Sequence, residues 1–499
     1  MKKQGSFRAA VLFLLLLSVV SCGETTQAPA DDISEKQTGT VTDSAVSETE
    51  AEKYLDSLPE TMDFGGYEFV ISSPAVWNSG DTYNQYLVPE AEIGEIINDT
   101  AFQRNKAAEE RLNVVISYTP GDDMNVSNRI QKSVTAGEKP CDIAVIEPQY
   151  WDSLGPLLST HALIDWNDIP YITKDASYYF PYVNDLFEVN GKQFALASYY
   201  GNSSLLPFHM VFNISMMNDL DIEVPYALIK NGGWTFDRFE EMLKDTYVDL
   251  NGDGKMDIGD QFGYVNEGAL TNNLFWGFGM NIVDRADDGS YLPAEMNDRL
   301  VSAYQRLLSF RDANGNCASP QNFVDFRKSI DMANPFTRGK ILFTTTGTGN
   351  LHAELRNVSF DVGIAPYPKY DDNQTSYQCN GSVFPLIVPA TVTETETVGA
   401  VTEVLSALSK QEMEPAVIDV YIEQKVLRDE ESVGIFRMMM DSVSIDITMY
   451  YRFSPDSKSI SPIVFLDKCK SDTVVSKLES VRSATEKNIE KYFAPFYED

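Results

Sequence analysis

The residues best suited to bind a metal ion lie in the segment DLNGDGKMDIGD, residues 249–260. Oxygen-bearing side chains stand at the first, third, fifth, ninth and twelfth positions of this segment, which are Asp249, Asn251, Asp253, Asp257 and Asp260. Gly254 allows a sharp turn, and Lys255 would contribute its backbone carbonyl. The pattern is that of an EF-hand-type calcium loop, although Asp260 replaces the usual bidentate Glu. We expect a structural Ca²⁺ site; the alternative is an acidic, glycine-rich turn without metal.

A second chemical pattern consists of aromatic residues beside amides and carboxylates. Sugar rings have apolar faces that pack on aromatic rings, while their hydroxyl groups need polar partners. Glu147 and Asn380 are such polar residues. For any one aromatic residue, packing in the core is an equally good explanation. The aromatic residues in or beside expected loops and strand ends are Trp77, Tyr150, Trp151, Tyr199, Tyr200, Phe275, Trp276, Tyr450 and Tyr451.

Catalytic motifs are scarce. The three histidines form no His-Glu-x-x-His motif, and the chain has no nucleophile elbow, phosphate loop or dinucleotide fingerprint. We therefore expect no enzyme and assign no catalytic residue. The chain's 74 acidic residues leave a carboxylate pair for glycoside hydrolysis open, because spacing along the chain does not give spacing in space.

The N-terminus has the features of a secreted lipoprotein. A positively charged start precedes an apolar run over residues 9–20, which is followed by Ser21, Cys22 and Gly23. This order predicts a signal peptide over residues 1–21. The segment VVSC resembles the lipobox of bacterial lipoproteins, so we expect Cys22 to carry a lipid anchor. The alternative is an ordinary signal peptide. Residues 22–60 are acidic and poor in large apolar residues, which predicts a disordered tether.

Composition indicates a large extracellular body. The chain has 499 residues and a formal net charge of −35, which disfavours binding to nucleic acid or anionic lipid. About 440 residues remain for a folded body, enough for two lobes. We expect a monomer. The four remaining cysteines, Cys141, Cys317, Cys379 and Cys469, allow three disulfide pairings, but unpaired cysteines are the favoured interpretation.

Strands and helices alternate after the tether. Strands are expected at 67–72, 114–118 and 142–146, and helices at 98–112 and 126–136. Such alternation is typical of a mostly parallel sheet, in which ligands bind beyond the carboxyl ends of the strands. The residues after Ile71 and Ile146 are therefore the first candidates for a ligand site.

Several segments, in order, resemble the extracellular solute-binding proteins of bacterial ABC transporters, the family 1 group related to maltose-binding protein. The resemblance covers about 290 residues and ends near Pro389. The matching segments are NDTAFQRNKAAEERLNV from Asn98, DIAV from Asp142, GKQFALA from Gly191, FN at Phe212, WTFD from Trp234, FTRGKILF from Phe336 and DVGIAPYP from Asp361.

The resemblance implies an α/β, two-lobed periplasmic-binding-protein-like fold of type II. Each lobe would be a mostly parallel sheet flanked by helices, followed by a largely helical C-terminal segment. Lobe 1 would comprise residues 61–197 and 364–388, and lobe 2 residues 198–363 and 389–499. Residues expected to line the cleft between the lobes are Trp77, Glu147, Tyr150, Tyr199, Trp276 and Asn380.

The implied function is capture of a sugar or oligosaccharide and its delivery to an ABC importer permease. The ligand could also be a peptide or another polar solute. Two alternatives remain: a calcium-stabilised surface glycoside hydrolase, and a surface glycan-binding lipoprotein without a role in transport.

Overall fold

The structure is a computed structural model, and it describes most of the chain from residue 55 onward. Cys22, the expected tether up to residue 54, Trp77, Tyr150 and Asp257 lie outside the described residues. The described residues are 55–74, 87–120, 125–147, 152–202, 207–256, 259–265, 270–312, 317–318, 335–348, 351, 355, 357–381, 383–423, 426–440, 442–453 and 469–497.

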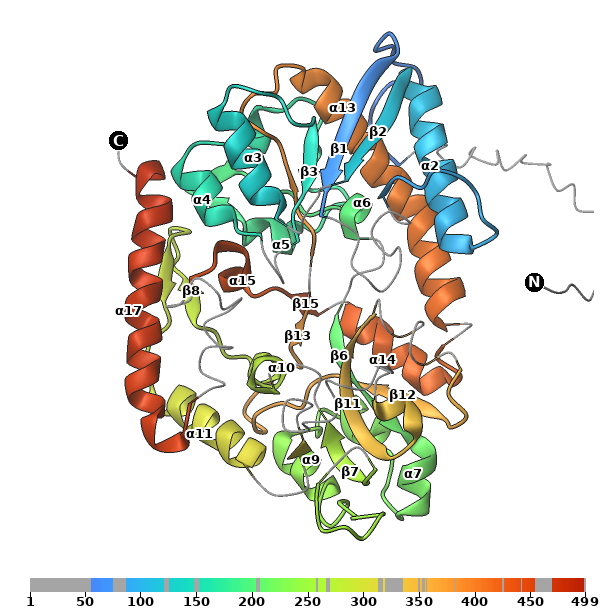
Figure 1. The fold of residues 1–499 in the computed structure, drawn as a ribbon, viewed down its shortest axis with the longest axis vertical. Helices are drawn as coiled ribbons and strands as arrows, with labels where there is room; N and C mark the ends of the chain where they lie inside the picture. The colour runs from blue at the N-terminus through green and yellow to red at the C-terminus, as the bar shows by residue number, and fades with distance from the viewer. Residues whose placement is uncertain are drawn as a thin grey trace, which may run out of the picture. The chain divides into compact units, whose positions relative to one another are not determined.

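The first sheet has four strands in the order β14-β3-β1-β2. The pairs β1–β2 and β1–β3 are parallel, as the alternation of strands and helices predicts, whereas β14 adds to β3 in the antiparallel direction. Figure 1 shows β1, β2 and β3 side by side, with α2 next to β2. The strands are β1 (Tyr67–Ser73), β2 (Val114–Pro120), β3 (Ile143–Val145) and β14 (Leu386–Ile387).

Each face of the first sheet has its own core, because successive side chains of a strand point to opposite faces. Phe69, Ile71 and Val145 lie in one cluster, which we call the α2-side core. Ala144 and Ile387 lie in the other, which we call the α4-side core. Both faces are therefore covered, as expected for a largely parallel sheet.

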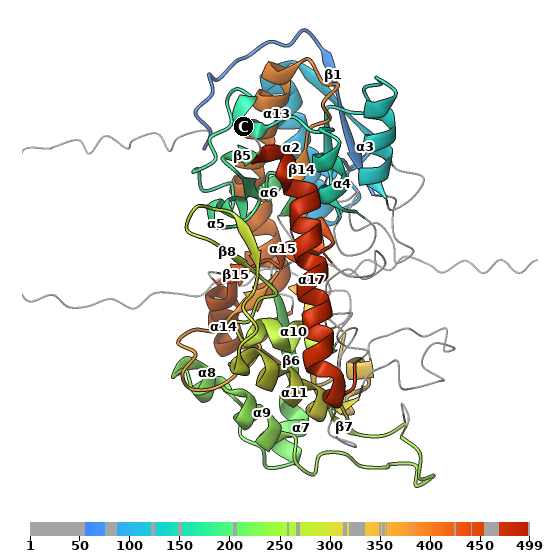
Figure 2. The ribbon, with the colours of Figure 1, turned by 90° about the vertical axis from the view of Figure 1, so that its left-hand side faces the viewer.

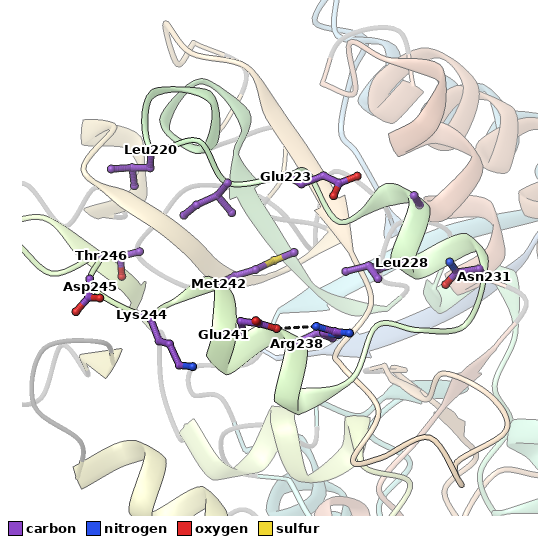
Figure 3. A pocket seen from close by; sticks show the side chains of 12 residues that line it. Leu220, Glu223, Leu228, Asn231, Arg238, Glu241, Met242, Lys244, Asp245 and Thr246 are labelled. Atoms are coloured by element: carbon purple, nitrogen blue, oxygen red, sulfur yellow. Dashed lines mark hydrogen bonds and ion pairs between the residues drawn. The ribbon is translucent and has the colours of Figure 1, made fainter.

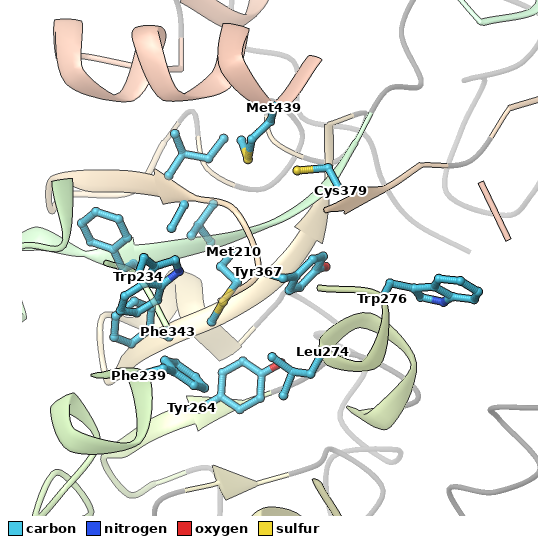
Figure 4. Packing of buried hydrophobic residues seen from close by; sticks show 14 of the residues in the cluster. Met210, Trp234, Phe239, Tyr264, Leu274, Trp276, Phe343, Tyr367, Cys379 and Met439 are labelled. Carbon is cyan, nitrogen blue, oxygen red and sulfur yellow. The ribbon is translucent and has the colours of Figure 1, made fainter. Parts of the chain in front are cut away.

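The second sheet has five strands in the order β10-β7-β11-β6-β12. Its large aromatic cluster, the second-sheet core, includes Trp234 stacked on Phe343 with ring centroids 5.9 Å apart (Figure 4). The strands are β6 (Phe208–Asn213), β7 (Phe262–Val265), β10 (Cys317–Ala318), β11 (Ile341–Gly347) and β12 (Val362–Ala365). Three further two-stranded pairs are β4 (Glu188–Val189) with β5 (Lys192–Gln193), β8 (Val283–Arg285) with β9 (Tyr291–Pro293), and β13 (Cys379–Asn380) with β15 (Val443–Ser444).

Helices cover the sheets and join them. They are α2 (Ile96–Leu112), α3 (Val126–Thr135), α4 (Leu154–Ser159), α5 (Pro181–Asp185), α6 (Tyr199–Asn202), α7 (Ile214–Asp219), α8 (Tyr226–Lys230), α9 (Phe236–Met242), α10 (Leu270–Gly277), α11 (Asp298–Asp312), α13 (Thr395–Leu408), α14 (Glu430–Met440), α15 (Ile447–Tyr451) and α17 (Val474–Phe493). Short 3₁₀ turns occur at Trp166–Asp168, Pro335–Arg338, Ser471–Thr473 and Ala494–Phe496, and π-helical turns at Ser409–Met413 and Ala416–Glu423.

Helix α2 begins earlier than the sequence suggests. The helix was expected to start at Asn98, but its N-cap is Glu95, and Asn98 and Asp99 lie inside it. The Asp99 carboxylate instead accepts hydrogen bonds from the backbone N–H groups of Ile93 and Gly94, at 2.8 and 3.0 Å. The side chain thus stabilises the turn that leads into the helix.

The C-terminal part of the chain packs against both sheets. Residues 389–499 were assigned from the sequence to lobe 2, but α13 packs beside α2 and buries Val401 and Leu405 in the α2-side core. Conversely, residues 364–365, assigned to lobe 1, belong to β12 of the second sheet. The long helix α17 starts with Val474 in the second-sheet core and ends with Phe493 in the α4-side core (Figure 2).

No helix in the described part of the chain combines the length and the apolar composition that a membrane span requires. Cys141 and Cys379 are free and buried, and Cys469 is buried as well. The expectation of unpaired cysteines stays a prediction, and the side chain of Cys317 lies outside the described residues.

Candidate ligand-binding site

Polar side chains gather where the strands of the first sheet end. Ser72 and Ser73 close β1, and the Arg129 guanidinium donates to Ser72 Oγ at 3.0 Å and to the Ser73 carbonyl at 3.2 Å. Tyr118, near the end of β2, lies 2.7 Å from Ser73 Oγ through its hydroxyl. Glu147 follows β3 and is fully buried. This edge of the sheet is where the fold predicts a ligand site.

Asp152 organises the residues around Glu147. Its carboxylate accepts hydrogen bonds from the backbone N–H groups of Ser127, at 2.7 Å, and Glu147, at 3.0 Å. Burial nevertheless raises the pKa of Asp152 to about 6, because these bonds offset only part of the desolvation. Arg452 donates through Nε to the Asp152 carbonyl at 2.9 Å, which brings the C-terminal part of the chain to this edge.

A cavity of about 570 Å³ lies where segments of several cores meet. Five aromatic residues line it, together with hydroxyl and amide groups. The aromatic residues are Tyr179, Phe180, Tyr182, Tyr199 and Tyr377. The neutral polar residues are Ser177, Ser376, Gln378, Ser442 and Ser444. Phe180 packs against the α2-side, α4-side and second-sheet cores alike, so the cavity lies at their junction.

Tyr199 is the sequence-predicted residue that lines this cavity, and it is held on three sides. Its ring stacks on Phe180 with centroids 4.7 Å apart. Its hydroxyl donates to Glu414 Oε1 at 2.8 Å and accepts from Lys410 Nζ at 3.0 Å. Lys410 also pairs with Glu414 and lies 4.4 Å from the centroid of the Tyr199 ring. At this wall of the cavity, the Tyr199 hydroxyl thus positions a donor, Lys410, beside an acceptor, Glu414.

Trp276 and Asn380 lie on neighbouring elements, because α10 and β13 are in contact. Trp276 is 8% exposed and Asn380 is 3% exposed. Among the described residues, neither Trp276 Nε1 nor Asn380 Oδ1 has a hydrogen-bond partner. In Figure 4 the indole lies at the edge of the second-sheet core and points away from Tyr367 and Leu274. Neither residue lines the cavity, but Ser444, the strand partner of Asn380, does.

Several lining residues carried no signal in the sequence. Lys410 lies 211 residues after Tyr199. It belongs to a helical segment whose sequence has the apolar pattern of a helix packed in the core. Phe180 and Tyr182 lie in and beside a helix of five residues, α5, which is too short to show periodicity. The Ser177–Tyr182 segment is rich in aromatic residues, and this was the one feature that could have indicated it.

The acidic loop of residues 249–260 forms a network of backbone turns. Asp249 accepts hydrogen bonds from the N–H groups of Gly252 and Gly254, at 2.7 and 2.9 Å. Asp260 is buried and accepts from Leu250 N–H at 3.2 Å. Within the described residues, which do not include Asp257, no group of three or more His, Cys, Asp or Glu side chains converges as metal ligands. The calcium site therefore stays a prediction.

A second cavity, of about 770 Å³, lies beside α8 and α9 (Figure 3). Arg238 and Glu241 form an ion pair at 2.7 Å on its wall. The apolar part of the lining comes from Leu220, Ile222, Leu228 and Met242. None of the residues predicted from the sequence lines this cavity, so the site at the junction of the cores is the candidate for ligand binding.

Comparison with known proteins identifies the fold. No protein-family model matches the sequence, and no curated protein matches it either. A sugar transporter from Rhizobium etli, in an open conformation, superimposes with a TM-score of 0.55 at 13% identity, over 84% of this chain and 99% of that one. UgpB from Mycobacterium tuberculosis, in complex with glycerophosphocholine, gives a TM-score of 0.54 at 15% identity, over 86% of this chain and 99% of that one.

An ABC substrate-binding protein from Listeria monocytogenes, in complex with cycloalternan, gives a TM-score of 0.52 at 12% identity, over 87% of this chain and 100% of that one. These likenesses show that the chain has the α/β, two-lobed periplasmic-binding-protein-like fold. The resemblance to ABC solute-binding proteins seen in the sequence is thereby confirmed at the level of the fold.

Proposed function

We propose that this protein is a lipid-anchored receptor on the extracellular face of a bacterial membrane. It captures a sugar or oligosaccharide and delivers it to an ABC importer permease. The observation that carries the proposal is the aromatic cavity at the junction of the cores, which unites Tyr199 with Lys410 and Glu414. The shared fold supports it.

The cavity has the size and the chemistry that such a ligand needs. Its volume of about 570 Å³ lies within the range of roughly 300–1,000 Å³ that is usual for small-molecule sites. The rings of Tyr182 and Tyr377 offer apolar faces to a sugar. Lys410 and Glu414, which are held by the Tyr199 hydroxyl, offer a donor and an acceptor to its hydroxyl groups. A ligand that contacts segments of both sheets would favour the conformation in which these segments are closest.

The test is a binding screen on the purified chain. Maltotriose, raffinose and cyclic glucans are compared with a tripeptide and a glycerophosphodiester by thermal shift, since a ligand that binds only the folded state raises Tm with concentration. Calorimetry then compares Tyr199→Ala with Tyr497→Ala, an exposed tyrosine outside the cavity. We expect Tyr199→Ala to weaken binding by about 2 kcal/mol. A shift by the peptide alone would contradict a carbohydrate ligand, and turnover of a bound glycan would favour the hydrolase.

The membrane anchor rests on Cys22. Metabolic labelling with an alkyne fatty acid should mark the wild-type protein and not Cys22→Ala. Equal labelling of both would contradict the anchor.

Delivery to a permease predicts that cells without this chain lose uptake of the bound glycan, whereas a surface glycan-binding lipoprotein would leave uptake unchanged.

The calcium site is proposed for the loop of residues 249–260, with Asp249, Asn251, Asp253, Asp257 and Asp260 as side-chain ligands and Lys255 through its carbonyl. A chelator should lower the Tm of the wild type, and Asp253→Ala should remove this sensitivity. Asp245→Ala, just before the loop, is the matched control. Equal Tm values of the wild type with chelator and with excess Ca²⁺ would contradict the site.

A further inference from the structure

One uninterrupted helical segment connects the cores of the two sheets. The backbone remains helical from Thr395 to Glu423. The first part of this segment buries Leu405 and Leu408 in the α2-side core, and the second part buries Met413 and Ile418 in the second-sheet core. A relative displacement of the two cores must therefore bend or twist this segment.

The type of helix changes at the point where the segment passes from one core to the other. It is α-helical up to Leu408, π-helical over Ser409–Met413 and, after two α-helical residues, π-helical again over Ala416–Glu423. π-Helical turns are rare, and they occur frequently at functional sites. Helix α17 also reaches two cores, but it is α-helical over its whole length, Val474–Phe493. The two connections thus differ in backbone geometry.

Arg104 supports the π-helical turn from inside the molecule. It is a fully buried residue of α2 and donates to Ser409 Oγ at 3.2 Å and to the Leu87 carbonyl at 2.7 Å. Its guanidinium lies 4.6 Å from the centroid of the Tyr200 ring. Burial lowers the pKa of Arg104 to about 10, and the nearby Glu412 carboxylate acts against this shift. The turn is thus tied to α2 and α6 by a cation.

The ligand cavity is connected to the same turn. Lys410 belongs to the turn and Glu414 follows it directly, and both contact the hydroxyl of Tyr199. Tyr199 and Tyr200 are consecutive in α6, so one short helix contacts the turn through Lys410 and also through Arg104. A ligand on Tyr199 would compete with Lys410 and Glu414 for the hydroxyl.

We propose that the π-helical turn Ser409–Met413 is the hinge, or joint, at which the two sheets of this receptor move relative to each other. We further propose that the Tyr199–Lys410–Glu414 contact couples ligand binding in the cavity to the conformation of this turn. The coupling through the Tyr199 contact rests on the proposed ligand site. The joint itself does not, because it concerns the ligand-free chain.

The experiment measures the distribution of distances between two spin labels by pulsed electron paramagnetic resonance. The chain carries Cys22→Ser and Cys317→Ser, with labels at Lys132→Cys in α3 and Asn218→Cys in α7, both of which are exposed. Deleting the exposed Gln411 shortens the π-helical turn by one residue, which should tighten it. We expect a narrower distribution than in the wild type. Gln411→Ala, which keeps the number of residues, should match the wild type, and an unchanged distribution after the deletion would overturn the joint.

A milder variant keeps the proposal testable if the deletion does not fold. Tyr199→Phe removes only the hydroxyl that joins Lys410 and Glu414, and we expect a broader distribution in the ligand-free chain. Tyr182→Phe, which lines the same cavity and is 63% exposed, is the matched control. Equal distributions for the two variants would overturn the role of the Tyr199 contact. The wild type and the four variants are all measured without ligand, so failure of the carbohydrate screen would leave these measurements interpretable.

Discussion

Asp152, at the end of the first sheet, links the stability of the folded structure to pH. It is fully buried, and its pKa is raised to about 6 from 3.8 by burial. The folded chain therefore holds a proton that the unfolded chain releases over the range between these two values. Stability from this residue must rise as the pH falls through about 6, and be lost again as the pH rises.

We expect Asp152→Asn to remove this dependence. The difference in unfolding free energy between variant and wild type should change by on the order of 2–3 kcal/mol between about pH 7.5 and pH 4, with the wild type relatively more stable at the acidic end. Urea unfolding at several pH values measures it. A constant difference across this range would show that Asp152 titrates normally in the folded chain.

Trp276 supports a prediction about packing. Its ring makes an edge contact with Phe275 at 6.0 Å and is largely buried. Trp276→Ala should therefore cost about 3–5 kcal/mol of stability, whereas Trp276→Phe should cost less because most of the apolar volume remains. Denaturant melts measure this loss, and calorimetry with any ligand found by the screen measures the separate loss in affinity. A stable Trp276→Ala chain would place the indole outside the core.

Individual residues of the site could be predicted from the sequence where they belong to the aromatic residues beside expected loops and strand ends, as Tyr199 does, or directly follow a recognisable strand. Glu147 was predicted because it directly follows β3, and it does lie at that edge. Lys410 could not be predicted, because its contact with Tyr199 depends on a π-helical turn for which the sequence has no periodic signal. Trp276 and Asn380 were predicted from residue type, and the contact between α10 and β13 that brings their elements together is long-range.

At the scale of elements, helix α13 packs closely against the backbone of the loop at Pro170. A Cβ atom on Gly399 would lie 1.9 Å from the carbonyl oxygen of Pro170, which is backbone and cannot turn aside. Gly434 in α14 has nothing within 4 Å of the corresponding position. The two glycines are therefore a matched pair in two helices.

We expect Gly399→Ala to destabilise the chain by about 2 kcal/mol or more, because α13 must move away from the loop at Pro170. Gly434→Ala should instead stabilise it by up to about 1 kcal/mol, because alanine is the better helix former. Thermal melts of both variants give the comparison. Equal effects of the same sign would contradict the close packing of α13.

Elements with strong local patterns matched the sequence analysis best. Strand β1 and helices α2 and α3 were found at their expected positions to within a few residues, because their apolar spacing is regular. The assignment of α13 to a lobe was decided instead by its contacts with α2, which a single sequence does not encode as a pattern. The same holds for α17, whose two ends lie in different cores.

At the scale of the whole molecule, the net charge of −35 predicts a response to salt. Like charges on a compact body repel, and a Debye length of about 10 Å at 0.1 M salt screens this repulsion. We expect Tm to rise when NaCl is increased from low to moderate concentration, with chelator present to exclude specific metal effects. An uncharged osmolyte at the same osmolality is the control, and a fall in Tm with salt would contradict the argument.

The position of β14 in the sequence, long after the other strands of its sheet, has a consequence for the order of folding. The first sheet takes this strand from residues that lie more than 200 positions after β3, and Trp166 Nε1 donates to the carbonyl of Leu386, 220 residues later, at 3.1 Å. A nascent chain that ends before β14 cannot complete its first core, although β1, β2 and β3 have long been synthesised. Contacts of such long range make folding slow. The chain should therefore remain open to chaperones until the second sheet has been made, and the two sheets should reach their native state together.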